Sequence, residues 1–217
     1  WSPELNSIPS STLKGVDAVI NLAGEGIADS RWSSERKDKI IRSRVISTRQ
    51  IIKAMTYMNE KPQVFLSASA IGFYGDRGDE LLNESSSNGE GFLSQVCQKW
   101  EDEINTAKAL GVRTVSLRIG MVLGHDGGAL EKMLPPFQLG VGGKLGSGSQ
   151  WMSWIHINDL VNMMIHAIEN SSLNGEYNAV SPTPVKNMEF TRTLGLVLKR
   201  PTIFPVPKVI LQIALGE

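Results

Sequence analysis

The sequence predicts an α/β protein built on a mainly parallel, doubly wound sheet. A near-continuous apolar run at residues 16–24 is typical of a strand that is covered on both faces, and two further strands are predicted at 63–70 and at 112–123, the last apolar at Val115, Leu117, Ile119 and Met121. Amphipathic helical patterns at residues 33–58 and 92–110 lie between them. Strands that alternate with helices of this length favour a parallel sheet, in which ligands bind beyond the carboxyl ends of the strands.

The first half of the chain carries clear boundary signals. Residues 1–15 are turn-rich and predict a loop with one short helical turn. Ser33 is placed to cap the first long helix, whose basic face we interpret as solvent-exposed. Gly111 follows the second helix, as glycine commonly does at a helix end. Between the second strand and that helix, glycines break the segment 71–80 into a loop.

The second half of the chain is more mixed. We expect a short helix at 129–138 that Pro135 and Pro136 interrupt, because proline removes a backbone donor. Asn158 is the expected cap of the next helix. The remaining expected elements are a helix at 158–169, a strand at 176–180, a helix at 187–198, an extended segment at 200–207 and a helix starting near Lys208.

Residues 124–160 form an unusual stretch, because a glycine-rich loop runs into an aromatic segment. Glycines at this density allow positive φ angles and a close approach to a ligand or to another part of the chain. Trp151 and Trp154 supply apolar walls with a polar N–H at the edge. We interpret the stretch as a pocket wall, with a structural loop as the alternative.

Composition bounds the function. The chain has 217 residues, of which 41% are hydrophobic and 20% charged, as in ordinary globular proteins. Lys and Arg total 22, as do Asp and Glu, so no basic excess points to nucleic acid or to an anionic membrane surface. No apolar run is long enough to span a bilayer.

Cysteine usage and the first residue bear on location. The single cysteine, Cys97, excludes an internal disulfide and fits a reducing compartment. We therefore expect a cytoplasmic protein. The chain begins with Trp1 rather than Met, so a targeting segment could precede it, and an organelle matrix is the alternative location.

Several motifs, taken together and in order, resemble the extended short-chain dehydrogenase/reductase superfamily, in its epimerase-like branch of unassigned function. These motifs are NLAGE (21–25), SASAIGFYGD (67–76), FLSQVCQKWE (92–101), RIGMVLGHDGGAL (118–130), LPPF (134–137), GGKLGSGSQW (142–151) and SWIHINDL (153–160). The resemblance implies a Rossmann-type NAD(P) fold at residues 1–124. It also implies a small substrate-binding part at 125–217, with segments returning to the core.

The sequence departs from that superfamily in two ways. The unit that opens the superfamily, a strand followed by GxxGxxG and a helix whose N-terminus seats a pyrophosphate, is absent together with the rest of the first βαβ half, and the glycine-rich segment 140–148 neither directly follows a strand nor opens a helix. We therefore expect the chain to be the middle of a longer protein, whose strand at 16–24 has an unpaired edge. The Tyr-x-x-x-Lys pair is also missing, because an alignment on Glu101 places Leu93 and Cys97 at its two positions. An alignment on Lys99 places Gln95 at the tyrosine position instead.

The candidate catalytic residues follow from the strand ends. Ser69 lies where the superfamily places a catalytic hydroxyl, and Tyr74 is the only tyrosine near the expected site. The alternatives are a serine that bonds to backbone and an aromatic residue that closes a loop. His125 and His166 lack metal-ligand spacing, so no metal site is predicted.

Binding residues are expected around the same edge. The candidate cofactor contacts are Asn21, Leu22, Ala23, Gly24, Ser67, Arg118 and Val122. The candidate substrate contacts are Glu25, Arg31, Gln150, Trp151, Trp154 and His156. Arg118 fits either a phosphate or a structural ion pair, and Glu25 and Arg31 either face substrate or pair with each other. His156 is a core residue in the alternative interpretation.

Two functions remain open from the sequence. The first is an NAD(P)-binding oxidoreductase or epimerase-like protein that acts on a small polar substrate, nucleotide-linked substrates included. The second is a non-catalytic NAD(P)-binding protein with a structural or redox-sensing role, which the missing Tyr-x-x-x-Lys pair favours. The resemblance alone prefers NADP to NAD. A small molecule is the expected partner, and a homodimer is one alternative.

Overall fold

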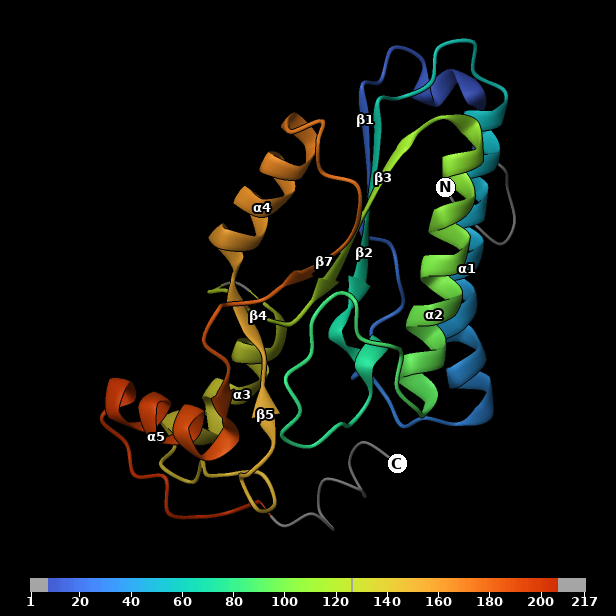
Figure 1. Cartoon of the computed structure of the whole chain (residues 1–217). Coiled ribbons are helices and arrows are strands. Elements are labelled where there is room, and N and C mark those ends of the chain that lie inside the picture. Colours follow the sequence, from blue (N-terminus) through green and yellow to red (C-terminus); the bar gives the residue numbers. More distant parts are fainter. Residues whose placement is uncertain (1–7, 126, 207–217) are drawn as a thin grey trace.

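A parallel four-stranded sheet forms the centre of the protein (Figure 1). The computed structural model describes residues 8–125 and 127–206. In the order β1-β2-β3-β7, the strands are Ala18–Asn21, Val64–Ala70, Arg113–Ile119 and Gly175–Ala179. All three pairings are parallel, which confirms the predicted α/β class with a parallel sheet.

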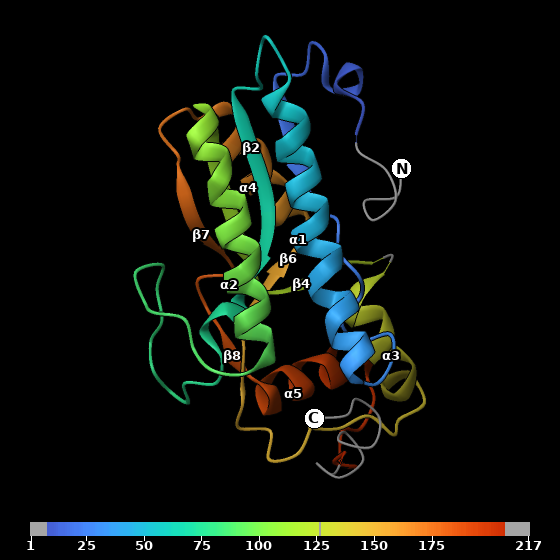
Figure 2. The same ribbon diagram turned by 90° about the vertical axis from the view of Figure 1, so that its right-hand side faces the viewer.

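Two long helices cover one face of the sheet. α1 (Ser34–Thr56) and α2 (Phe92–Asn105) lie side by side there, and the 3-10 helix η3 (Thr106–Leu110) continues α2 (Figure 2). Phe65 of β2 and Met55 of α1 are fully buried in the core between these layers. Each such side chain contributes about 1.5–3 kcal/mol relative to an exposed one.

A single helix covers the other face. α4 (Ile157–Glu169) packs Leu160 and Met164 onto Leu66 and Leu117 of the central strands (Figure 1). The central strands β2 and β3 are therefore covered on both faces, in agreement with their nearly continuous burial. α4 and β7 belong to this main layer structure although they follow residue 125, in agreement with the expectation that later segments return to the core.

The predicted strand at 112–123 is two strands. β3 ends at Ile119, and β4 (Met121–Leu123) pairs instead with β6 (Trp154–His156). Gly120 lies at the change of partner, where its N–H bonds to the carbonyl of Ala179. A Cβ at this position would lie 2.6 Å from the carbonyl oxygen of Ser153, so only glycine lets the chain cross there.

A smaller part of the protein lies below the sheet in the view of Figure 1. It contains α3 (Gly128–Gln138), β5 (Trp151–Met152), β8 (Val185–Lys186) and α5 (Asn187–Leu198), with β5 and β8 antiparallel. The expected interruption of the helix at Pro135 and Pro136 was wrong, because α3 continues through both. The two carbonyls that lose their helical donors belong to exposed residues, where water can bond to them.

Other boundaries shift by a few residues. β1 is shorter than the predicted strand at 16–24, so Leu22 to Gly24 already lie in a loop. Short 3-10 helices occur at Ser10–Leu13 (η1), as predicted before Gly15, and at Ile71–Tyr74 (η2). The helix expected near Lys208 lies outside the described residues. None of the described helices combines the length and the apolar character that crossing a bilayer requires.

Candidate functional site

The carboxyl ends of the central strands bring several predicted residues together. Asn21 of β1 is buried, and its Nδ2 donates to Thr48 Oγ1 at 2.9 Å and to Ser67 Oγ at 3.3 Å. Its Oδ1 accepts from the N–H of Ala23, which fixes the loop after the strand. Ser67 is fully buried, with its hydroxyl hydrogen-bonded to Asn21 and to backbone, so it braces neighbouring strands.

A buried ion pair lies at the centre of this edge. Arg118 of β3 donates from Nε to Glu101 Oε1 at 2.9 Å and from Nη2 to Oε2 at 2.8 Å. Both residues are at least nine-tenths buried. Burial alone lowers the pKa of Arg118, but its bonds to Glu101 and Tyr74 outweigh burial and raise that pKa overall. Of the two alternatives for Arg118, the structure contains the ion pair.

Both candidate catalytic hydroxyls are attached to that pair. Ser69 donates to Glu101 Oε1 at 2.6 Å and is 3% exposed. Tyr74 accepts from Arg118 Nη1 at 3.0 Å and donates to Asn178 Oδ1 at 2.7 Å. The two hydroxyls therefore belong to one hydrogen-bonded network, and each donates its hydrogen bond to a protein acceptor.

Leu93 and Cys97, the positions of the missing Tyr-x-x-x-Lys pair in the alignment on Glu101, lie beside η2. A Cβ at Gly72 of η2 would lie 3.3 Å from Leu93 Cβ and 3.7 Å from Cys97 Sγ. Burial, and then the charge of Glu101, raise the pKa of the Cys97 thiol to about 11. Cys97 is therefore a protonated thiol at neutral pH and a poor nucleophile.

The loop after β1 is organised by basic residues of α1. Leu22, Ala23 and Gly24 are exposed, and a Cβ at Gly24 would lie 3.0 Å from Arg44 Cζ. Arg44 lies over the Trp100 ring and donates to the carbonyl of Glu25 at 3.0 Å. The main chain of 22–24 is thus fixed in position and exposed to solvent at the strand ends.

Glu25 and Arg31 do not pair with each other. Glu25 bonds to Arg36 at 2.5 Å and lies 3.5 Å from Lys39, and the bond from Arg36 is the main reason that the pKa of Glu25 is lowered. Arg31 is exposed, and within residues 8–125 and 127–206 it makes no ion pair. The expected rim salt bridge exists with a different cation.

The aromatic segment contacts the loop after Tyr74. Trp151 Nε1 donates to Asp79 at 2.6 Å, and Lys186 lies 3.3 Å from the same carboxylate and over the Trp151 ring. These contacts lower the pKa of Asp79, the Trp151 bond most strongly. Gln150 instead donates to the carbonyl of Leu145.

The glycine-rich loop owes its composition mainly to chain packing. A Cβ at Gly142 would lie 2.5 Å from the Phe137 ring, and one at Gly143 would lie 1.9 Å from the carbonyl oxygen of Phe204. Leu145 then forms an isolated parallel β-bridge with Val206. Of the two interpretations of this stretch, these glycines support the structural loop.

Three other candidates hold local structure. Val122 and Trp154 lie in the paired strands β4 and β6, and both are half-buried. His156 caps α4, because its Nδ1 accepts from the N–H of Asn158 at 3.2 Å. The predicted cap, Asn158, was therefore wrong by two residues, and the exposed His156 is not a core residue.

Sequence reasoning missed four residues of this site. Glu101 was used only to align the helix, while Thr48, Asn178 and Asp79 were not singled out. A charged residue on the inner face of an amphipathic helix was the available signal for Glu101, since buried charges require partners. The other three are polar residues of ordinary surface type, which no pattern distinguishes. The described residues hold no cluster of three His, Cys, Asp or Glu side chains that could bind a metal ion.

Comparison with known proteins places the chain in a family. Residues 8–180 match the NAD dependent epimerase/dehydratase family. The chain belongs to this family. The epimerase family protein ML0860 of Mycobacterium leprae is 38% identical over 217 residues, covering 100% of this chain and 70% of that protein. A chloroplastic family member of Arabidopsis thaliana, an SDR39U1 homologue, is 43% identical over 94% of this chain and 59% of its own length.

Solved structures of the epimerase family share the Rossmann-like fold. A crystal structure of human epimerase family protein SDR39U1 with NADPH matches 97% of this chain and 74% of that chain, with TM-score 0.87 and 34% identity. UDP-glucuronic acid 4-epimerase from Bacillus cereus, solved with UDP-glucuronic acid and NAD, is 18% identical. The match covers 93% of this chain and 65% of the Bacillus cereus chain, with TM-score 0.79, and at this identity it shows a likeness of fold alone.

Proposed function

We propose that this chain binds NADPH and takes part in an oxidoreductase or epimerase-like reaction on a small polar substrate, nucleotide-linked substrates included. One observation supports NADPH as the cofactor: the human relative that matches 97% of this chain at 34% identity was crystallised with NADPH. The chain spans 59–71% of the length of its first curated relatives. The activity is therefore proposed for the whole protein to which these residues belong.

The residues present fit part of a dinucleotide. The exposed main chain of 22–24, fixed by Asn21 and Arg44, offers a surface where backbone can approach a ribose or base. The GxxGxxG spacing occurs at 72–78 and at 140–146, but no described α-helix begins at either place, so pyrophosphate binding is not assigned to any group here. When bound, NADPH supplies a hydride.

The network at the strand ends limits acid–base chemistry. For Tyr74 to give its proton to a substrate oxygen, its bond to Asn178 has to be exchanged for one to the substrate. Arg118 would stay bonded to the phenol oxygen and favour the oxygen that has lost its proton. Ser69 is less suited, because its proton already lies on a charge-assisted bond to Glu101.

The same contacts favour a second candidate function. If Ser69 and Tyr74 only complete the buried network, the protein binds NAD(P) without catalysis and acts as a structural or redox-sensing protein. The occupied hydroxyls support this candidate, together with the absence of the Tyr-x-x-x-Lys pair in either alignment of residues 92–101.

The test separates binding from chemistry. NADPH and NADH are titrated against the protein by calorimetry, and NADPH consumption is then followed with a panel of nucleotide sugars and small carbonyl compounds. We expect saturable binding with NADPH preferred. Turnover that Tyr74→Phe removes while NADPH binding persists supports the enzyme, and NADPH binding without any turnover supports the non-catalytic role. Absence of binding to either cofactor overturns both.

A further inference from the structure

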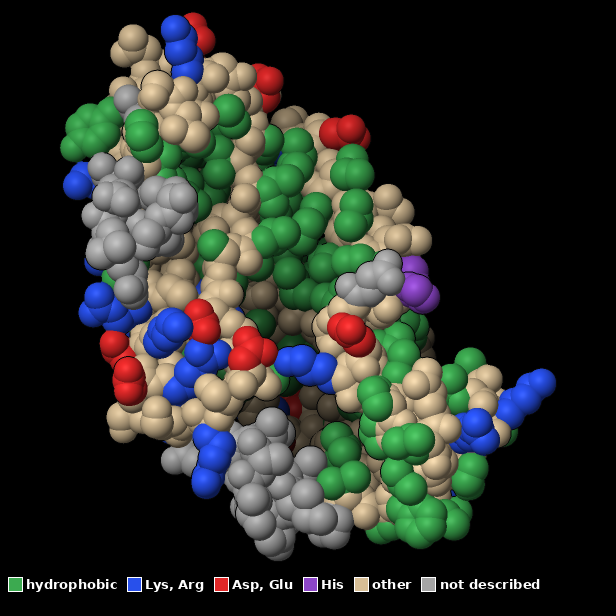
Figure 3. Space-filling view, turned by 180° about the vertical axis from the view of Figure 1, so that it is seen from behind, with side chains coloured by type: hydrophobic (Ala, Val, Ile, Leu, Met, Phe, Trp, Pro, Cys, Tyr) green, Lys and Arg blue, Asp and Glu red, His purple; other side chains and the backbone are tan. Residues whose placement is uncertain are grey.

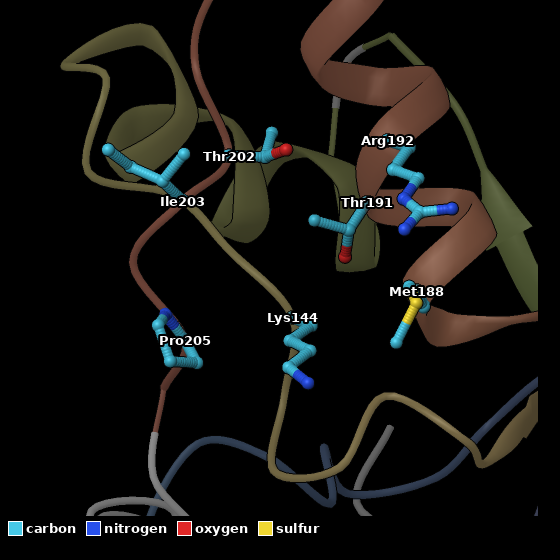
Figure 4. A pocket seen from close by; sticks show the side chains of 7 residues that line it. All are labelled: Lys144, Met188, Thr191, Arg192, Thr202, Ile203 and Pro205. Atoms are coloured by element: carbon cyan, nitrogen blue, oxygen red, sulfur yellow. The ribbon is translucent and has the colours of Figure 1, made fainter.

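A second hollow lies away from the strand ends, in the smaller part of the protein. It has a volume of about 180 Å³ and opens between α5, the loop carrying Lys144 and the segment 202–205 (Figure 4). Met188, Thr191 and Arg192 of α5 form one wall. None of its lining residues belongs to the site around Asn21 and Arg118, and its size suits a small group rather than a dinucleotide.

The charges around this hollow are of one sign. Lys144 and Arg192 both line it, and no carboxylate does. Within the part of the chain that the structure describes, neither cation makes an ion pair or a side-chain hydrogen bond. Two cations that share a hollow without a counter-charge repel each other, and an anion between them removes that repulsion.

A buried hydroxyl completes the set of donors. Thr191 is 3% exposed, and its Oγ1 has no hydrogen-bond partner. Figure 4 shows its side chain projecting from α5 into the space between Lys144 and Thr202. Buried hydroxyls almost always have a partner, so an unpartnered one beside two free cations indicates a missing acceptor.

The walls of the hollow are fixed to each other. Asn187, at the start of α5, accepts from the N–H of Leu145 through its Oδ1 at 2.8 Å. The carbonyl of Lys144 accepts from the N–H of Val206 at 2.8 Å, which ties the segment 202–205 to the loop that carries Lys144. A site on backbone held in this way keeps its donors in place before the ligand arrives.

We propose that this hollow binds a phosphate group, held by Lys144, Arg192 and the hydroxyl of Thr191. Guanidinium, ammonium and hydroxyl donors together match the several acceptor oxygens of a phosphate. The group comes either from free inorganic phosphate or from a phosphorylated small molecule. The site is separate from the proposed NADPH site and does not depend on it.

The test uses the whole chain and titrates inorganic phosphate, and separately a nucleoside diphosphate, by calorimetry at low ionic strength. Lys144→Gln and Arg192→Gln should each weaken phosphate binding about tenfold, the effect of losing one charge-assisted bond. Thr191→Val tests the hydroxyl at nearly constant volume and should also weaken binding. Arg200→Gln is the matched control, because it removes a nearby exposed cation that does not line the hollow.

The outcomes decide the assignment. Loss of binding in the three hollow variants and retention in Arg200→Gln support the site, and tighter binding of the diphosphate identifies a phosphorylated molecule as the source. Wild-type protein without saturable phosphate binding overturns the proposal, as does equal binding by all four variants. Lys144→Arg, which keeps the charge, should restore binding and so excludes a mere loss of folding.

Discussion

Arg118 and Glu101 form the most deeply buried ion pair of the site, and at the residue scale they set the energetics there. Their side chains are 5% and 7% exposed. Removing charges from water costs free energy that close pairing and additional hydrogen bonds must offset. Ser69 and Tyr74 supply those additional bonds, so the four side chains stabilise the fold as a unit.

Glu101→Leu should lower the free energy of unfolding by about 3–5 kcal/mol, because Arg118 is left as a buried charge without a counter-ion. Glu103→Leu on the same helix is the matched control. It removes the pair with Arg49. The Glu103 side chain is 12% exposed, but the Arg49 side chain left behind is 59% exposed and stays hydrated, so the change should cost about 1 kcal/mol or less. Urea unfolding of both variants measures the difference, and equal losses would contradict the role assigned to burial.

Cys97 should make stability depend on alkaline pH. Burial, and then the charge of Glu101, raise its pKa to about 11 in the folded state, against an ordinary value of 9.0. Both states hold the proton below pH 9, but between pH 9 and 11 only the unfolded state loses it. Stability therefore falls across this window, by about 3 kcal/mol for a pKa difference of about two.

The measurement for Cys97 is the pH dependence of urea unfolding in the wild type minus that in Cys97→Ala. Other groups that titrate at alkaline pH contribute to both proteins and cancel in the difference. A wild type and a variant whose stabilities run parallel from pH 8.5 to 11 (roughly the window that the two pKa values define) would show that the thiol is not held protonated.

At the scale of the elements, the capping of helix ends contributes to stability. The hydroxyl of Ser33 accepts from the N–H of Arg36 at 3.1 Å, which satisfies one of the free donors at the start of α1. Ser33→Ala should therefore lower the free energy of unfolding by about 1 kcal/mol. Ser34→Ala, one residue later in the helix, lacks a capping bond and should change stability little. Circular dichroism during urea unfolding compares the two, and equal effects would rule out the cap.

The elements themselves were largely predictable, and their exceptions have physical causes. Ser33, the apolar spacing of α1 and the glycine after η3 are local signals, and local signals fix helices. The break at Gly120 was not recognised, because apolar residues recur on both sides of it and the strand changes partner only through contacts with Ser153 and Ala179. Tertiary pairing, rather than propensity, ends that strand.

The site was predictable in position but not in connectivity. Parallel strands place Asn21, Ser67 and Ser69 near one edge, and their spacing predicted this. The partners are remote in sequence: Tyr74 bonds to Asn178 104 residues away, and Ser69 bonds to Glu101 32 residues away. A hydroxyl at a strand end gives no sign of whether it faces a ligand or a buried carboxylate.

At the scale of the whole molecule, the sheet is covered unevenly. Among the described strands, β1 pairs only with β2, so it forms an edge, as expected from the sequence. Ile20 of β1 and Val161 and Ile165 of α4 are 49%, 44% and 46% exposed. Viewed from behind, hydrophobic side chains gather in a continuous area of the surface (Figure 3). Apolar areas of this kind and free strand edges both favour association.

We expect the 217-residue chain to self-associate through this face. Ile165→Glu places a charge that would have to be buried on association, so the variant should shift toward monomer in sedimentation velocity runs over a range of concentrations. Leu196→Glu is the matched control, because Leu196 is 79% exposed but lies on α5 in the smaller part. Leu196→Glu should alter the urea midpoint little, since that side chain is largely in water, whereas Ile165 is 46% exposed and Ile165→Glu should lower the midpoint somewhat. If Leu196→Glu disperses the protein as well as Ile165→Glu does, net charge controls association, and the apolar surface around Ile20, Val161 and Ile165 is not the contact.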